Sequence, residues 1–230
     1  MREDIVAAIT KTTNRRSLFH FTRADNLLAI ARLDSLLSSS RIDPGLTGER
    51  RLQAMKVTSD KYSITINAHL KIPDIMMDAS ITQEQFRTCL DRHVFFWPTL
   101  KDCRKMMDTY ARREPEERFA VLEFDAYFLM TGHFSAVKLS KYDSGSAPRF
   151  PKTCSYRKSL EMFLPLDQFK LVSGSIVPTK ASEIREVLIE DRVMNVSDYL
   201  QAVYVDRCED APMLWRKWIR PLAELRDKGR

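Results

Sequence analysis

The stretch SLFHFTRADNL, residues 17–27, places a histidine inside an aromatic strand end, directly before a helix. His20 lies between Phe19 and Phe21, and Asn26 follows in the next helical turn. A lone histidine at a strand end often only completes the core with a satisfied hydrogen bond. The alternative is a polar group at the mouth of a ligand cleft. The helix start would offer unpaired N–H groups and a positive dipole end, and the Asn26 amide suits a base or a ribose.

A carboxylate in the apolar stretch SYRKSLEMFLPL is the second candidate for chemistry. If this stretch is a strand, Glu161 lies on the face opposite Leu160 and Met162. An edge-strand glutamate commonly faces water. In a cleft, the same carboxylate accepts hydrogen bonds from sugar hydroxyls or acts as a base.

The segment that leads into Glu161 is a long loop rich in cations. Residues 138–158 contain six basic residues and one acidic residue, Asp143. This bias favours a loop that grips an anionic substrate. The predicted substrate contacts are Lys141, Arg149, Lys152 and Arg157.

Two adjacent arginines, Arg50 and Arg51, follow a glycine-containing loop in GERRLQ. Adjacent arginines are often only solvated. A guanidinium is also the group that recognises a pyrophosphate through two parallel hydrogen bonds.

The stretch HVFFWPT contains three consecutive aromatic residues, Phe95, Phe96 and Trp97. Their simplest interpretation is a core strand that ends at Pro98. One ring of the three could instead stack on a flat heterocycle.

Short strands and helices alternate along the chain without a regular βαβ repeat, which predicts an α+β fold in a single domain over residues 1–230. Helices are expected over 2–12, from 27, near 82–92, over 100–114 and over 212–225. Strands are expected over 18–21, 93–97, 119–124, 160–169 and 187–193. Residues 38–62, rich in Ser, Pro, Gly and charge, predict a loop with little regular structure.

The charge and cysteine content of the chain indicate which kinds of partner and metal site to expect. A net charge of +6 and a pI near 9.2 favour an anionic partner such as nucleic acid. The four cysteines and four histidines are scattered without zinc spacing, so we expect no metal site and a cytoplasmic, reduced protein. The chain has neither a P-loop nor a G-x-G-x-x-G motif, and no apolar run long enough to span a membrane.

In order, the chain reads H-F-T-x-x-x-N-L-x-x-I, an arginine-bearing loop, V-F-F-W-P, and a long loop ending in S-L-E-M-F-L-P. This layout, from about Leu18 to Phe169, resembles DarT-like ADP-ribosyltransferases of the bacterial toxin and phage-defence type. The resemblance implies two small twisted sheets that form an NAD cleft, with flanking helices. Residues 170–230 would then be an extension packed on this domain.

The resemblance also implies roles for individual residues. It makes Glu161 and Arg51 catalytic, and it assigns NAD contacts to His20, Thr22, Asn26, Leu27, Arg50 and Phe96. The histidine would hydrogen-bond a ribose of NAD, and the arginine would lie near the phosphates. Where related enzymes stack a tyrosine on nicotinamide, this chain has phenylalanine, which stacks without a hydroxyl.

The implied activity is transfer of ADP-ribose from NAD to a base of single-stranded DNA or RNA, because a base must be unstacked to react. The glutamate would stabilise positive charge at the ribose and deprotonate the acceptor. An antitoxin or chaperone partner is implied as well. The alternatives are a protein ADP-ribosyltransferase, an RNA 2′-phosphotransferase-like enzyme, which needs a denser arginine cluster, and a non-catalytic nucleic-acid-binding module.

Overall fold

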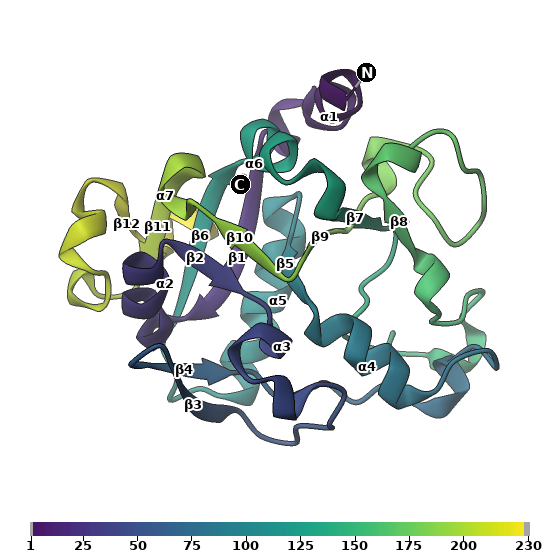
Figure 1. Ribbon diagram of the computed structural model, residues 1–230, viewed down its shortest axis with the longest axis horizontal. Coiled ribbons are helices and arrows are strands. Elements are labelled where there is room, and N and C mark those ends of the chain that lie inside the picture. The colour runs from purple at the N-terminus through teal and green to yellow at the C-terminus, as the bar shows by residue number, and fades with distance from the viewer. Residues whose placement is uncertain (1, 228–230) are drawn as a thin grey trace.

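The computed structural model describes residues 2–227, which form a mixture of short helices and short strands (Figure 1). The helices are α1 Arg2–Thr10, α2 Leu27–Leu33, α3 Ser39–Ile42, α4 Gln83–Asp91, α5 Leu100–Arg113, α6 Ala126–Gly132, α7 Val196–Tyr199 and α8 Leu222–Asp227. The strands are β1 Ser17–Arg23, β2 Ser35–Leu37, β3 Met55–Ser59, β4 Tyr62–Ile66, β5 His93–Phe96, β6 Phe119–Asp125, β7 Val137–Ser140, β8 Phe163–Pro165, β9 Glu186–Glu190, β10 Arg192–Met194, β11 Leu200–Val205 and β12 Ile219–Pro221.

Two four-stranded sheets form the centre of the molecule. The first has the order β1-β6-β11-β12, and the second has the order β5-β9-β7-β8. All neighbours are antiparallel except β11 and β12, which are parallel. There are also two small two-stranded antiparallel sheets, β10-β2 and the hairpin β3-β4. The expected mixture of helices with several small sheets is confirmed.

Among the described residues, one backbone bridge joins the two large sheets. Phe19 in β1 and Trp97, just after β5, exchange both backbone hydrogen bonds, with N–O distances of 3.0 and 2.9 Å. Extending this antiparallel register would pair residue 21 with residue 95, but no such pairing forms. The strands separate after the bridge, and a gap opens between β1 and β5.

Residues 186–221 contribute strands to both large sheets. The sequence predicts an extension packed on a domain made by earlier residues. The structure instead places β9 between β5 and β7, and β11 between β6 and β12. The first of these strands follows a long segment, 141–185, whose two ends are adjacent because Ser140 pairs with Glu186.

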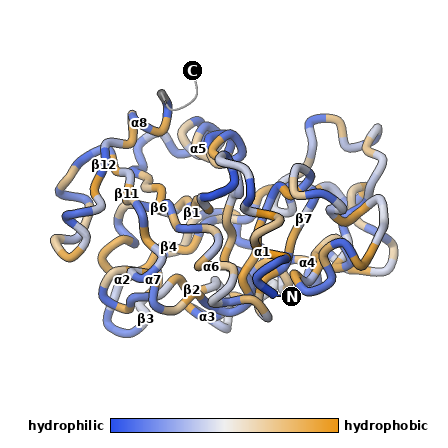
Figure 2. The backbone as a smooth tube through the Cα atoms, turned by 90° about the horizontal axis from the view of Figure 1, so that it is seen from above, coloured by the Kyte–Doolittle hydropathy of each residue, from blue (hydrophilic) through white to orange (hydrophobic). Residues whose placement is uncertain are grey.

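Amphipathic helices cover the sheets. The 14-residue α5 begins at Thr99, whose hydroxyl accepts the N–H of Asp102. It buries Met107 and Tyr110 against a cluster that includes Phe119. In Figure 2, hydrophilic and hydrophobic stretches alternate along such helices. Within residues 2–227, no helix is long and apolar enough to cross a membrane.

Part of the stretch expected to be an irregular loop is a hairpin. Strands β3 and β4 pair from Met55↔Ile66 to Ser59↔Tyr62. The turn residues Asp60 and Lys61 have φ values of 46° and 70°, the left-handed region that tight hairpin turns require. The alternation in KVTSDKYSITI carried this signal, but its charged residues obscured it.

The expected C-terminal helix over 212–225 is also interrupted. A 3₁₀ segment over Met213–Trp218 leads into β12, which ends at Pro221, and α8 begins only at Leu222. Proline lacks the N–H that a continuous helix needs at that position and clashes with the preceding turn. Its backbone is suited instead to the edge strand where it lies.

The Asn26 side chain holds the β3-β4 hairpin against the 3₁₀ turn Ala24–Asn26, which connects β1 to α2. The Asn26 amide donates from Nδ2 to the Thr65 carbonyl at 3.0 Å, and its Oδ1 accepts the Thr65 N–H at 2.8 Å. Asn26 is 7% exposed. A side chain amide therefore supplies both of the hydrogen bonds that a neighbouring strand would supply.

We expect Asn26→Ala to destabilise the fold by about 2 kcal/mol, because it leaves a buried donor and acceptor of Thr65 unpaired. Urea unfolding followed by circular dichroism measures the loss, and Gln53→Ala, at an exposed position, is the control. Equal stability of both variants would show that the hairpin is held by other contacts.

Candidate active site

A cavity of about 230 Å³ is lined by residues of both β1 and β5. Its walls come from β1, β5, the hairpin strand β4 and the residues that follow it, and helix α5. The lining includes the aromatic residues Phe95, Trp97 and Tyr110. It also includes the polar residues His20, Thr22, Arg51 and Glu186. An apolar cleft with a few converging polar groups is the usual form of a small-molecule site.

His20 lies at the point where β1 and β5 separate. Its Nδ1 is 2.9 Å from the Phe95 carbonyl oxygen, which can only accept, so Nδ1 carries the proton. Burial lowers the pKa of His20 to about 4, so the ring is neutral near pH 7. The Nε2 atom is then an acceptor, and no residue in 2–227 donates to it. This arrangement suits a hydroxyl donor in the cavity.

Glu186, the first residue of β9, faces the same cavity and is 2% exposed. Its Oε2 accepts the Ser144 N–H at 3.0 Å and the Ser144 hydroxyl at 2.6 Å. Burial raises the pKa of this carboxyl, and the nearby Asp143 raises it further. Among the described residues none donates to Oε1. Glu186 is therefore a buried carboxyl with one oxygen held and one free to act.

Lys158 fixes the loop that holds Glu186. Its ammonium group is fully buried and donates to the carbonyl oxygens of Asp143 and Ser144, at 2.7 and 2.8 Å. Burial lowers the pKa of Lys158, opposed by Asp143 and Glu186. The ring of Phe86 lies 5.7 Å from the ammonium nitrogen. A buried cation thus orders the two residues that position Glu186.

Arg51 is held in a buried network on the opposite wall. It makes a two-pronged ion pair with Asp91, at 2.6 and 3.2 Å, and donates from Nε to the Asn67 carbonyl. Burial raises the pKa of Asp91, but the hydrogen bonds from His69 and Arg51 outweigh it and keep the pKa below its ordinary value. His69 Nδ1 accepts the Arg51 N–H, so Nε2 carries the proton and donates to Asp91.

This tautomer leaves the guanidinium one donor to spare. Nη2 of Arg51 lies 3.0 Å from Nε2 of His69, but both atoms carry hydrogen, so this approach is not a hydrogen bond. Arg51 lines the cavity. One Nη2 hydrogen of Arg51 therefore has no acceptor among the described residues.

Of the other residues predicted to contact NAD, the structure brings some to the cavity and not others. Thr22 and Asn26 line it, although the Asn26 amide is occupied by Thr65. Leu27 and Phe96 are fully buried in the core and do not line it. The Phe96 ring lies beneath His20, with ring centroids 5.5 Å apart. Arg50 lines a neighbouring cavity.

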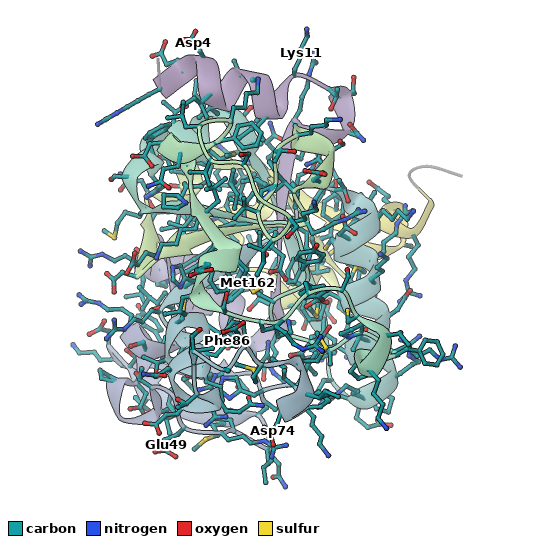
Figure 3. The ribbon with its side chains drawn as sticks, turned by 90° about the vertical axis from the view of Figure 1, so that its right-hand side faces the viewer. Asp4, Lys11, Glu49, Asp74, Phe86 and Met162 are labelled. Atoms are coloured by element: carbon teal, nitrogen blue, oxygen red, sulfur yellow. The ribbon has the colours of Figure 1, made fainter. Side chains whose placement is uncertain are left out.

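Glu161 does not reach this cleft. It lies on the surface in a 3₁₀ turn over Leu160–Met162, and the expected strand begins only at Phe163. Its neighbour Met162 is the buried one, beside Phe86 (Figure 3). Turn geometry, rather than strand alternation, directs the carboxylate outward.

Of the basic residues in segment 138–158 that were predicted to contact the substrate, some line a cavity and others do not. Lys141 lines a second cavity and pairs with Glu183 at 3.2 Å. Arg149 and Lys152 are exposed, and Arg149 lies over the Phe150 ring. Arg157 donates to carbonyl oxygens of its own loop. Only the first of the four predicted substrate contacts therefore lies near Glu186.

That second cavity, of about 460 Å³, adjoins the first at Glu186. The two share Leu70, Trp97, Met106 and Glu186 as walls. Lys105, Lys141 and Arg185 line the far side of the second cavity, with Asp102 and Asp143. The Glu186 carboxyl thus lies on the wall between an aromatic cleft and a cavity lined by charged groups of both signs.

The sequence contained a signal for Glu186 that the strand assignment missed. The stretch EVLIEDRV was recognised as a strand from Val187, one residue too late. Glu186 opens a buried strand and directly follows Arg185, and a carboxylate beside apolar strand residues is the pattern sought at Glu161. Both Glu161 and Glu186 follow basic residues in the sequence. The sheet order, with β9 between β5 and β7, is what brings Glu186 to the cleft.

Within residues 2–227, no group of His, Cys, Asp and Glu side chains is arranged to hold a metal ion. The four cysteines are free thiols.

A family model matches residues 16–200. The chain belongs to DUF7002, a family of unknown function. The matched range includes the three strands that provide His20, Phe95 and Glu186, so the whole cleft lies inside the family's common part. No curated protein matches the chain.

The structure is also similar to several solved structures. Thermosipho africanus DarTG in complex with ADP-ribose matches with 12% identity and a TM-score of 0.44, covering 91% of this chain and 50% of that chain. The chain thus spans about half the length of that relative. Thermus sp. 2.9 DarT in complex with NAD⁺ matches with 15% identity and a TM-score of 0.39, covering 90% and 93%.

The same Thermus sp. 2.9 protein in complex with ADP-ribosylated ssDNA matches with 14% identity and a TM-score of 0.41, covering 90% of this chain and 92% of that chain. These proteins carry the name of the group that the sequence layout resembles. The function of this chain is argued below from its own cleft.

The buried imidazole makes a prediction about acid stability. The unfolded chain protonates His20 below its ordinary pKa of 6.5, whereas the folded chain keeps it neutral down to about pH 4. The unfolded state binds more protons in this window, so stability falls as the pH falls. Between about pH 7 and about pH 5, we expect wild type to lose about 2 kcal/mol more than His20→Gln.

Urea unfolding of both proteins at each pH measures this difference. The other three histidines are present in both proteins, so their contributions cancel. Parallel curves for wild type and His20→Gln would mean that His20 is solvated in the folded protein.

Proposed function

We propose that this protein is an ADP-ribosyltransferase that uses NAD as donor and a base of single-stranded nucleic acid as acceptor. The observation that carries the proposal is the pairing of His20 Nε2 and Glu186 on the walls of one aromatic cleft. The residue order that resembles DarT-like enzymes supports it, as does the net charge of +6. Toxicity and a neutralising partner follow from the resemblance alone and stay predictions.

The cleft fits the parts of NAD. The unprotonated Nε2 of His20 accepts a hydrogen bond from a ribose hydroxyl, and Phe95 and Trp97 offer faces to a flat ring. The spare Nη2 hydrogen of Arg51 suits a phosphate oxygen. Its charge is already shared with Asp91, so we assign Arg51 to positioning the donor more than to neutralising it.

Glu186 takes the role that the sequence assigned to Glu161. NAD supplies a ribose carbon bonded to a cationic leaving group, so positive charge grows on that ribose as the bond breaks. An ionised carboxylate beside it stabilises this charge. Glu186 faces the donor cleft and the second cavity at once, and Ser144 holds it in place.

The transfer breaks one bond to the ribose carbon and forms another, and the carboxylate accepts the proton that is released. The ribose–nicotinamide bond breaks, and its electron pair leaves with nicotinamide. The acceptor nitrogen or oxygen bonds to the same ribose carbon, and its proton passes to Glu186. Because Glu186 is the group that accepts this proton, it must be ionised when the acceptor attacks.

The second cavity provides the acceptor side. Lys105, Lys141 and Arg185 bring three cations to a lining that also contains the carboxyl groups of Asp102, Asp143 and Glu186. A base brought there would meet Glu186 from the side opposite the donor. A nucleic acid is more consistent with these cations than an acidic protein segment, because the cavity is concave and suits a single unstacked base.

We expect Glu186→Gln to reduce transfer by about a hundredfold or more, because glutamine cannot accept the proton. Glu161→Gln, the same substitution at a surface position, should keep wild-type activity. The measurement is the mass gain of one ADP-ribose unit on single-stranded DNA, RNA or protein incubated with NAD.

The reverse result, loss with Glu161→Gln and none with Glu186→Gln, would restore the surface glutamate to catalysis. A mass gain only on protein would identify a protein ADP-ribosyltransferase. Nucleic acid bound without any mass gain would identify a non-catalytic module.

The raised pKa of Glu186 predicts the pH dependence of transfer. Below that pKa the carboxyl is protonated and cannot accept a proton, so kcat/KM falls as the pH falls. The acid limb should lie above 4.5, the ordinary value for glutamate. The Ser144 hydroxyl lowers this pKa, so Ser144→Ala should move the limb to higher pH. A profile unchanged by Ser144→Ala would separate the limb from Glu186.

A further inference from the structure

A third cavity, of about 380 Å³, lies between α1, the start of α5 and residues 181–185. Three cations line it, namely Arg15, Lys101 and Arg185. None of the described residues that line it is acidic, and the polar remainder consists of Thr12, Asn14, Thr99 and Ser182. The cavity is therefore a basic pocket with hydroxyl and amide donors around it.

Arg15 is the unusual member of this pocket because it is buried without a counter-charge. It is 6% exposed, and both of its Nη atoms donate to one neutral acceptor, the Ile184 carbonyl, at 3.3 Å. No carboxylate among residues 2–226 lies within ion-pair distance of it, although Asp102 is close enough for its charge to raise the pKa of Arg15. Burial lowers the pKa of Arg15, but a guanidinium keeps its charge in proteins. Such a group is costly unless an anion pairs with it.

The start of α5 adds to the positive potential. Thr99 and Lys101 line the cavity, and the first N–H groups of a 14-residue helix carry partial positive charge. The nearest carboxylate, Asp102, lines the neighbouring acceptor cavity. It lies 3.5 Å from both Arg185 and Lys105, so its charge is shared there.

Arg185 connects this pocket with the acceptor side of the cleft. It lines both the basic pocket and the cavity that contains Glu186. Its backbone N–H donates to the Ser140 carbonyl at 2.8 Å, which fixes it beside the start of β9. The basic pocket and the acceptor cavity therefore adjoin at Arg185, whose guanidinium also lies 3.5 Å from Asp102.

We propose that the Arg15–Lys101–Arg185 pocket binds a backbone phosphate of the acceptor strand, away from the base that reacts. This inference rests on the proposed function for the kind of acceptor. It supplies the acceptor with a grip that is independent of sequence, because a phosphate carries no base identity. A free phosphate ion has the same chemistry, and the experiment below separates the two sources.

The test measures binding of a fluorescently labelled single-stranded oligonucleotide over a range of salt concentrations. Each phosphate contact on a single strand contributes about 0.7 to the slope of log K against log salt. Lys101→Gln should lower the slope by about 0.7 and weaken binding roughly fourfold at physiological salt, alike for different base sequences. Lys11→Gln is the control, since Lys11 is exposed just after α1 and outside the pocket (Figure 3).

Arg15→Met adds a readout that a purely structural residue would not give. It removes the unpaired charge but keeps an apolar stem in the core, so the melting temperature should be unchanged or higher while the salt slope falls. A lower melting temperature with an unchanged slope would make Arg15 structural. Lys101 is exposed, so Lys101→Gln decides the question even if Arg15→Met does not fold.

The outcomes separate this inference from the proposed function. Unchanged slopes in both variants, or no binding of nucleic acid by wild type, would overturn the phosphate site. Inorganic phosphate that raises the wild-type melting temperature without competing with the oligonucleotide would show a free-ion site instead, which also overturns it. The proposed function is judged separately by mass gain, so a lost slope without transfer would retain the site and reject the enzyme.

Discussion

The candidate site depends on the single backbone bridge between Phe19 and Trp97. It joins two four-stranded sheets at one point, and beyond it β1 and β5 separate. The backbone groups exposed by this separation need partners, and the His20 ring provides one by donating to the Phe95 carbonyl. The same ring then presents its second nitrogen to the cleft. The junction between the sheets and the polar handle of the cleft are therefore one arrangement.

Two buried ionic groups support this junction from opposite walls. Arg51 and Asp91 neutralise each other and attach the β3-β4 side to the end of α4. Lys158 lacks such a pairing and donates to backbone carbonyls, which makes it dependent on the loop that it orders. Removing one member of either group would leave an uncompensated buried charge or buried acceptors. Both groups thus stabilise one geometry of the cleft.

Local patterns predicted much of the fold. The strand at His20, the aromatic strand at 93–97 and the helix over 100–114 lie where sequence periodicity indicated. His20, Thr22 and Asn26 reach the cleft because each lies on or beside a predicted element, whereas Arg51 reaches it from the stretch predicted to be a loop. Glu161 does not, because one 3₁₀ turn changes which side chain faces inward. No local pattern reveals that β9, far along the chain, inserts between β5 and β7.

Ser140 and Glu186 are paired neighbours, although 45 residues separate them in the chain. The segment between them starts and ends at one edge of the cleft. The entropic cost of closing such a loop grows only slowly with its length. Insertions and deletions in its exposed part, near Arg149, therefore cost little as long as β8, Ser144 and Lys158 keep their places. Changes in the length of this segment can alter one edge of the cleft while the pairing of β7 with β9 is kept.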